Sequence, residues 1–386
     1  MRTVTAQITL KKGREQSLLR FHPWVFSGAI QQVEGQPNEG DWVEVKDAGR
    51  QTLAFGHYQN GSIAVRVLHF GTLIPPHLYR QKLSRAFELR SLVRSNTTNC
   101  FRLVHGEGDG LPGLIIDIYA GVAVVQAHSV GVHTDRAAVA EALQEVMADE
   151  LAAMYYKPVI SGMQAEYLMG MAAVPHSVRE HGNAFLVDWE EGQKTGFFLD
   201  QRENRMRLAA YATNRLVLNT FCYTGGFSVY ALQAGARLVH SVDASARAVD
   251  LARRNLEVNG FSIDPHEVFV ADTFEFLKAG KTVYDLIILD PPAFAKHKDA
   301  RHQAMKGYQR LNAEAMRCIA PGGILFTFSC SQVVDRQLFY DTVVSAAIQS
   351  GRQISVLEQL SQPADHPVSI YHAEGEYLKG LVLHVQ

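Results

Sequence analysis

One cysteine of this 386-residue chain stands where a thiol could do chemistry. Cys330 follows directly after the apolar residues 323–328 and lies between Ser329 and Ser331. Parallel sheets bind ligands at the carboxyl ends of their strands, and a thiolate placed there can attack a substrate and form a covalent intermediate. We therefore expect a catalytic role for Cys330. The cysteines that we expect to be small buried apolar residues, the common role of this residue type, are Cys100, Cys222 and Cys318.

A glycine pair and an acidic residue follow two neighbouring strand-like segments. Gly225 and Gly226 come after residues 216–218, and Asp243 ends the next segment, 18 residues after Gly225. The glycines let the backbone turn tightly near a ligand, and the carboxylate can accept hydrogen bonds from both hydroxyls of a ribose. This series is typical of a site for an adenosine-containing cofactor, although without GxGxxG a dinucleotide is disfavoured. The alternative is a glycine pair used for packing and a surface aspartate.

Two further aspartates follow strand-like segments. Asp290 follows residues 285–289 and precedes Pro291 and Pro292. Consecutive prolines make a rigid extended turn, so we expect Asp290 at the mouth of the site. Asp272 follows residues 268–270 and precedes a helical run, so its alternative role is that of a helix cap.

Two basic clusters stand out from a chain whose formal net charge is −2. Residues 77–102 contain six Lys or Arg against one Glu, and residues 294–310 contain five against one Asp. Together they favour a nucleic-acid backbone over a small metabolite, whereas the alternatives are a solvated helix face and a flexible charged loop. The residues that we predict to contact RNA are Arg80, Lys82, Arg85, Arg90, Arg94, Lys296 and Lys298.

The elements that must position these residues fall into three regions. Short strand-like segments with turn signals make residues 1–73 a small β-rich module. Residues 77–185 combine helical and strand patterns in an α+β middle domain. In residues 186–386 apolar strands alternate with helices, which indicates a parallel sheet covered on both faces. The predicted fold class is therefore α/β, with the β-rich and α+β regions preceding the parallel sheet.

Composition excludes several other classes of protein. The chain is 47% hydrophobic and 20% charged, which is typical of a globular protein and excludes a disordered or collagen-like one. Four cysteines are too few for a disulfide scaffold, and their spacing with histidine predicts no metal site. The first residues lack the apolar core of a signal peptide, and no apolar run reaches the ~18 residues needed to cross a bilayer. We therefore expect a cytoplasmic protein.

Separate motifs also occur in a fixed order along the whole chain. They are HPWVFSGAI at 22–30, RLVHGEGDGLPGL at 102–114, KTGFFLDQR at 194–202, the glycine turn, Asp290-Pro291-Pro292, Ser329-Cys330-Ser331, ADHP at 364–367 and GEYLKG at 375–380. In this order they resemble the RlmI family of bacterial 23S rRNA (cytosine-carbon-5) methyltransferases. Residues 190–386 alone resemble the class I methyltransferases that depend on S-adenosylmethionine.

The resemblance implies a PUA-like RNA-binding domain over residues 1–73, a middle domain over 77–185 and a Rossmann-like methyltransferase domain over 186–386. It implies that Cys330 adds to a cytosine of 23S rRNA and that Asp290 holds the base while carbon 5 receives the methyl group. The residues that it implies for binding S-adenosylmethionine are Phe221, Tyr223, Thr224, Gly225, Gly226, Asp243, Asp272, Asp290, Lys194, Gln201 and Arg202.

Other functions stay open at this point. Methyltransferases that act on an exocyclic amine use an Asn/Asp-Pro-Pro-aromatic turn, whereas here Ala293 follows the prolines and such chemistry has no use for Cys330. An RNA-binding assembly factor without catalysis is the other alternative, and a methyl-transfer assay separates the two. We expect naked rRNA or an early assembly intermediate as the substrate and a monomer or homodimer as the protein. The group that removes the carbon-5 proton is left open.

Overall fold

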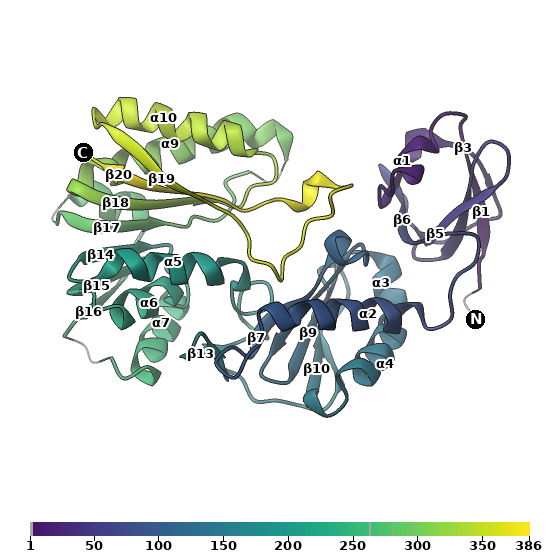
Figure 1. Cartoon of the computed structure of the whole chain (residues 1–386), viewed down its shortest axis with the longest axis horizontal. Helices are drawn as coiled ribbons and strands as arrows, with labels where there is room; N and C mark the ends of the chain where they lie inside the picture. Colours follow the sequence, from purple (N-terminus) through teal and green to yellow (C-terminus); the bar gives the residue numbers. More distant parts are fainter. Residues whose placement is uncertain (1–2, 262–263, 281, 296) are drawn as a thin grey trace. The chain divides into compact units, whose positions relative to one another are not determined.

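The computed structural model describes residues 3–261, 264–280, 282–295 and 297–386 (Figure 1). The chain folds into two compact units, each described here by itself. The first unit holds Met1–Val178, Val187–Phe197 and Ala364–Gly375, and the second holds the rest: Arg179–Leu186, Phe198–Pro363 and Glu376–Gln386. The three predicted domains, 1–73, 77–185 and 186–386, stay a prediction.

The first unit begins with a six-stranded sheet in the order β2-β6-β5-β4-β1-β3. Its elements are β1 (Ala6–Leu10), α1 (Gln16–Leu19), β2 (Trp24–Phe26), β3 (Ile30–Glu34), β4 (Trp42–Lys46), β5 (Thr52–Tyr58) and β6 (Ile63–Phe70). Ile8, Val43 and Val65 are fully buried and belong to one core. The predicted β-rich character of this region is confirmed.

A five-stranded sheet follows in the same unit, in the order β11-β10-β9-β8-β7. Its strands are β7 (Cys100–His105), β8 (Leu114–Tyr119), β9 (Val122–Ala127), β10 (Ala153–Tyr156) and β11 (Glu166–Met169), and its helices are α2 (Leu78–Leu89), α3 (Val130–Thr134) and α4 (Arg136–Met147). Leu83 of α2 and Leu143 of α4 share a core with Leu103 and Ile116 of the sheet. The predicted α+β character of this region is confirmed.

The second unit is built on a seven-stranded sheet in the order β16-β15-β14-β17-β18-β20-β19. The strands are β14 (Leu216–Thr220), β15 (Leu238–Asp243), β16 (His266–Val270), β17 (Tyr284–Leu289), β18 (Ile319–Ser329), β19 (Ile354–Leu360) and β20 (Lys379–Val385). The first five are parallel, as predicted, and β20 runs antiparallel to both of its neighbours. The strand order reverses between β14 and β17, and a ligand crevice forms at such a point.

Helices cover both faces of this sheet (Figure 1). They are α5 (Arg202–Ala212), α6 (Gly226–Gln233), α7 (Ala246–Val258), α8 (Thr273–Ala279), α9 (Arg301–Cys318) and α10 (Arg336–Ser350). Helices α5, α6 and α7 pack together, and α8, α9 and α10 form a second packed set. Because right-handed crossovers leave β14 in opposite directions, the two sets lie on opposite faces. Strand β17 is consequently buried from Leu286 to Leu289.

Within the described residues, no helix is long and apolar enough to cross a bilayer. Those residues also contain no group of three or more His, Cys, Asp or Glu side chains that could hold a metal ion.

Candidate active site

Cys330 lies at the carboxyl edge of the sheet, directly after the buried strand β18. Its side chain is half-buried, and its Sγ is 4.0 Å from the carbonyl oxygen of Pro291, in the turn that follows the neighbouring strand β17. The Ser331 hydroxyl donates to the carbonyl of Ala295 at 2.8 Å and so connects the segment after β18 with the segment after β17. The three cysteines expected to be buried are buried: Cys100, Cys222 and Cys318.

A lysine that sequence reasoning did not select as a site residue lies beside Cys330. Lys379 begins β20 opposite Ser329 of β18 and is only 3% exposed. Its Nζ donates to the carbonyls of Ser331 and Tyr377, each at 2.7 Å. Burial lowers the pKa of Lys379 to about 8, and the negative charge that Cys330 can carry is the strongest influence in the opposite direction. The one feature of the sequence that could have indicated this residue is its position, a lysine at the start of an apolar strand.

Tyr308 of α9 packs against the turn that follows Asp290. Its ring packs on Phe294 with a centroid separation of 4.6 Å and is fully buried. Burial raises the pKa of Tyr308 to about 12, and nearby Cys330 and Asp290 act in the same direction, more weakly. The phenol therefore stays neutral at physiological pH, and Asp290 itself is half-buried at the end of β17.

The glycine turn has the conformation that the sequence predicts. Gly225 precedes α6 with φ 75°, a left-handed conformation that favours glycine, and a Cβ there would lie 3.1 Å from Cβ of Ala252. Phe221 and Tyr223 also have positive φ, 52° and 47°. Bulky residues adopt this conformation rarely and at an energetic cost, and such strain is concentrated at functional sites. The turn is thus held in a shape that an unconstrained chain would avoid.

Asp243 fixes the turn from the neighbouring strand. Its Oδ2 accepts from the backbone N–H of Tyr223, and its Oδ1 accepts from that of Ser245, both at 2.9 Å. A carboxylate has about four acceptor positions, so both oxygens can accept further hydrogen bonds. Thr224 is fixed too, because its carbonyl accepts from the side-chain amide of Asn255 at 2.8 Å.

Asp272 has the capping role that was its alternative. Its Oδ1 accepts from the backbone N–H of Glu275 at 3.1 Å and so caps α8. The residue is exposed at the end of β16. Its contact with a cofactor stays a prediction.

The residues predicted near position 200 divide between the two units. Lys194 belongs to the first unit and is exposed, whereas Gln201 and Arg202 belong to the second and are buried. The Arg202 side chain is fully buried, with its Nε 3.5 Å from the carboxylate of Glu180. Since no part of Arg202 reaches the surface, the predicted direct contact with a cofactor is wrong for this residue. It supports the start of α5 through Glu180, which is also paired with Arg205 at 2.8 Å.

The predicted RNA-facing set is only partly on the surface. Arg80 and Arg85 are exposed, and Arg94 is half-buried over the ring of Phe87, 3.8 Å from its centroid. Lys82 donates to the carbonyl of Gly110 at 2.6 Å, and burial lowers its pKa to about 8. Two further members are Lys296, which lies outside the described residues, and Lys298, whose side chain also lies outside them.

Arg90 corrects the prediction. It is fully buried, its guanidinium pairs with both oxygens of Asp109 at 2.7 and 2.6 Å, and it donates to the carbonyls of Arg102 and Asp365. A buried, fully engaged guanidinium cannot contact a phosphate. Arg90 therefore stabilises the fold and is not part of an RNA surface.

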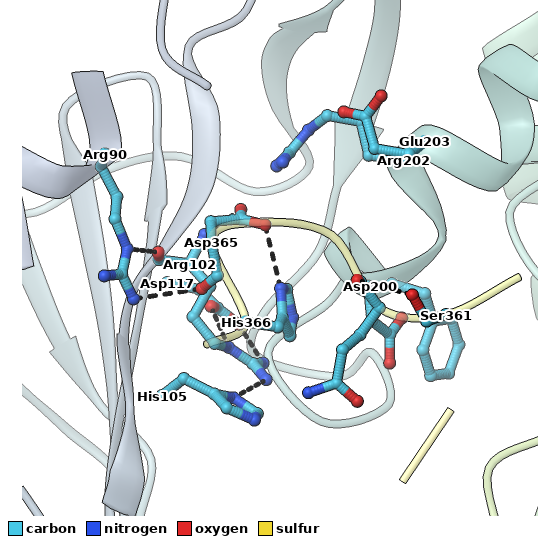
Figure 2. Close-up of polar contacts among 12 residues, drawn as sticks. Arg90, Arg102, His105, Asp117, Asp200, Arg202, Glu203, Ser361, Asp365 and His366 are labelled. Atoms are coloured by element: carbon cyan, nitrogen blue, oxygen red, sulfur yellow. Dashed lines mark hydrogen bonds and ion pairs between the residues drawn. The ribbon is translucent and has the colours of Figure 1, made fainter. Parts of the chain in front are cut away.

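Figure 2 shows Asp365 of the ADHP segment beside Arg90, whose guanidinium donates to the Asp365 carbonyl at 3.1 Å. The Asp365 carboxylate accepts from the backbone N–H of Arg102 at 3.0 Å, and His366 lies over His105 with a ring separation of 5.1 Å. Arg102 in turn pairs with the buried Asp117 at 2.8 Å. Two of the motifs quoted above, 102–114 and 364–367, therefore form one buried polar network in the first unit.

An aromatic patch on the first unit was also missed from the sequence. We define it as Phe21, His22, Phe26 and Tyr371. Phe21 and Tyr371 are 51% and 53% exposed, and their rings lie 5.4 Å apart. His22 lies 5.8 Å from Phe26, which is 45% exposed. Phe21 has φ 60°, so a strained backbone presents this ring to solvent.

Comparison with known proteins agrees with this geometry. A PUA-like domain model matches residues 8–70, and a model of S-adenosylmethionine-dependent methyltransferases matches residues 102–382. The chain is 40% identical to the ribosomal RNA large subunit methyltransferase I of Aeromonas salmonicida, over 97% of this chain and 98% of that protein. It is also 40% identical to the protein of that name from Salmonella arizonae, over 98% and 97%.

A solved structure from Streptococcus mutans, assigned to the SAM-dependent methyltransferases, has the same fold. It superposes with a TM-score of 0.86 at 21% identity, over 99% of this chain and 100% of that one. The glycine turn, Asp243 and the strand order fit the cofactor of that family. The chain therefore belongs to the S-adenosylmethionine-dependent methyltransferases, in the family of the ribosomal RNA large subunit methyltransferase I proteins.

Proposed function

We propose that this enzyme transfers a methyl group from S-adenosylmethionine to carbon 5 of a cytosine in 23S rRNA through a covalent bond to Cys330. The observation that carries the proposal is the half-buried thiol at the carboxyl end of β18, beside the Asp290 turn. The names of the relatives support ribosomal RNA of the large subunit as the substrate. Chemistry at an exocyclic amine would leave this thiol without a use.

The glycine turn and Asp243 would hold S-adenosylmethionine, which supplies an electrophilic methyl group on a sulfonium. Gly225 permits the positive φ of the turn and its close packing on Ala252, and the remaining acceptor positions of Asp243 suit the two ribose hydroxyls. Phe221, Tyr223, Thr224 and Gly226 shape the same turn. The residues of the second unit that we propose to complete the cofactor site are Asp272, Asp290 and Gln201. The contact of Lys194 with the cofactor stays a prediction.

Cys330 makes carbon 5 reactive. Carbon 5 of cytosine is a poor nucleophile, so the Sγ thiolate adds to carbon 6 and its electron pair forms the S–C6 bond. The ring electrons displaced toward carbon 5 then form the new bond to the methyl group. A base takes the carbon-5 proton, the C5–C6 double bond re-forms, and the S–C6 bond breaks to release the thiolate. Asp290 would hold the ring in place during these steps.

The aromatic patch is the surface that we propose for single-stranded regions of the RNA substrate. Lys11, Lys12, Arg14 and Arg20 are exposed in the segment that leads to Phe21, with Glu15 as its one acid. Stacking of bases on exposed rings contributes about 1–3 kcal/mol per base, and nearby cations attract the backbone. Holding the flanking strand would offset the cost of taking the target base out of its stack.

Removing the rings of the patch should weaken RNA binding without affecting the cofactor. For Phe21→Ala combined with Tyr371→Ala we expect at least about a tenfold rise in the Kd for a 23S rRNA fragment, consistent with the loss of one or two stacking contacts. Fluorescence anisotropy would measure it. The matched control is Ile370→Ala, an 89% exposed neighbour that has no ring. Equal affinities for the double variant and wild type would remove the patch from the RNA surface.

The exposed arginines of α2 should contribute to the salt dependence of RNA binding. Each phosphate contact adds about 0.7–0.9 to the slope of log K against log salt. Reversing both charges, Arg80→Glu with Arg85→Glu, should therefore flatten that slope by roughly 1.5. Titrations between about 50 and 200 mM salt would show the change. A slope identical to that of wild type would place α2 away from the RNA.

The reaction itself is tested by the identity of the product. Purified enzyme, labelled S-adenosylmethionine and a 23S rRNA transcript are incubated, and the RNA is digested to nucleosides for mass spectrometry. We expect 5-methylcytidine. Label on the exocyclic nitrogen of a base would overturn the carbon-5 assignment, and RNA binding without any label would support the assembly-factor alternative.

A further inference from the structure

We propose that the buried ammonium of Lys379 holds Cys330 in its thiolate form and so sets the pH at which this thiol becomes nucleophilic. Lys379 acts through Cys330 and is a positioning residue rather than a catalytic one. The consequence for methyl transfer rests on the proposed function, whereas the charge pairing itself can be tested without RNA.

The strand register brings the two residues together. Strand β20 pairs antiparallel with β18, and Lys379 is opposite Ser329, the residue before Cys330. The Nζ of Lys379 donates at 2.7 Å to the carbonyl of Ser331, the residue after Cys330. Lys379 is therefore held at both neighbours of the thiol: its backbone is opposite Ser329 in the strand pairing, and its ammonium is hydrogen-bonded to Ser331.

The position is an unfavourable one for a cation unless it has a charged partner. Lys379 starts a strand whose next residues, Gly380 to Leu383, are buried, and an ammonium loses its hydration there. Two carbonyl groups replace part of that hydration. Among the charges around Lys379, the one that favours the protonated form most is Cys330. The interaction is mutual, so a charged Lys379 favours the thiolate to the same extent.

The other charges near the pair do not replace Lys379. Arg336, at the start of α10, is ion-paired with Glu376 at 2.6 Å, and Asp335 next to it carries a negative charge. Asp290 and the neutral phenol of Tyr308 also lie near the thiol. A carboxylate there disfavours a second negative charge, whereas the ammonium of Lys379 favours it.

The direction of the pH dependence follows from the lowered pKa of Lys379. Below a pH of about 8 the lysine is protonated and can stabilise the thiolate. As the pH rises through about 8 the lysine loses its proton and that stabilisation is lost. An uncharged side chain at position 379 removes the stabilisation at every pH, so the thiolate should form at a higher pH.

Alkylation by iodoacetamide tests this on the full-length protein, because the reagent reacts with the thiolate. Cys100, Cys222 and Cys318 are buried, and mass spectrometry of peptides identifies Cys330 as the modified residue. The rate of alkylation is measured as a function of pH. For wild type we expect the midpoint of this profile to lie below pH ~8.5, the value for a free thiol. For Lys379→Met we expect a midpoint about one unit higher, and thus alkylation about tenfold slower at neutral pH. Lys379→Arg, which keeps the charge, should recover part of the rate.

Arg336→Met is the matched control, since it removes a nearby cation that is not hydrogen-bonded to the Cys330 segment. Its midpoint should stay close to that of wild type. The proposal is overturned if Lys379→Met titrates as wild type does. If that variant does not fold, as judged by circular dichroism, a wild-type midpoint at the free-thiol value overturns it equally. If the alkylation profiles are as expected but the enzyme makes no 5-methylcytidine in the methyl-transfer assay, only the proposed function is refuted.

Discussion

Replacing Cys330 with alanine is expected to lower methyl transfer to 23S rRNA by at least about a thousandfold, because without the S–C6 bond carbon 5 has no reactive electron pair. The affinity for S-adenosylmethionine should stay within about twofold of wild type, since the glycine turn and Asp243 do not depend on the thiol. Incorporation of labelled methyl groups measures the first quantity, and calorimetric titration measures the second.

The control for this variant is Cys100→Ala, which removes a fully buried thiol of the first unit and should keep the wild-type rate. RNA that carries 5-fluorocytidine at the target offers a second test, because fluorine cannot leave as a cation and the covalent adduct should accumulate. We expect a gel-stable adduct with wild type and none with Cys330→Ala. A Cys330→Ala enzyme that methylates at the wild-type rate would refute covalent catalysis.

Arg90→Ala is expected to lower the free energy of unfolding by about 3–5 kcal/mol, because it leaves the carboxylate of Asp109 buried without its partner. The carbonyls of Arg102 and Asp365 lose a donor in the same variant. Urea denaturation followed by fluorescence would measure the change.

Arg85→Ala, on the helix α2 that ends just before Arg90, is the matched control, and its exposed side chain should change stability by less than about 0.5 kcal/mol. The two variants should therefore affect different properties. Arg90→Ala loses stability, whereas charge removal at Arg85 alters the salt dependence of RNA binding. An Arg90→Ala protein as stable as wild type would contradict the role that we assign to this ion pair.

Patterns local to one stretch of sequence predicted the parallel sheet and the residues at the carboxyl ends of its strands. A fully apolar strand such as β17 must be covered on both faces, and the glycine turn before α6 needs a residue that tolerates positive φ. Asp243 was found because it ends strand β15, and Cys330 because it directly follows strand β18. Short-range patterns are sufficient for features of this kind.

Features that depend on distant partners could not be predicted in the same way. Arg90 has the sequence surroundings of an exposed helical arginine, and it is buried by Asp365, 275 residues further along the chain. Lys379 approaches Cys330 only through the register of β18 and β20, and the aromatic patch forms only when Tyr371 packs beside Phe21. Pairings over such separations leave no periodic trace in the sequence.

The return of Ala364–Gly375 to the first unit limits how this protein can be dissected. A fragment ending at Val178 would lack Asp365 and His366 and would expose Arg90 and Gly108, where an added Cβ would clash with the carbonyl oxygen of Pro367. No single truncation therefore yields either half intact. We expect that the first unit, made alone, will need residues 364–375 supplied as a separate peptide or by circular permutation.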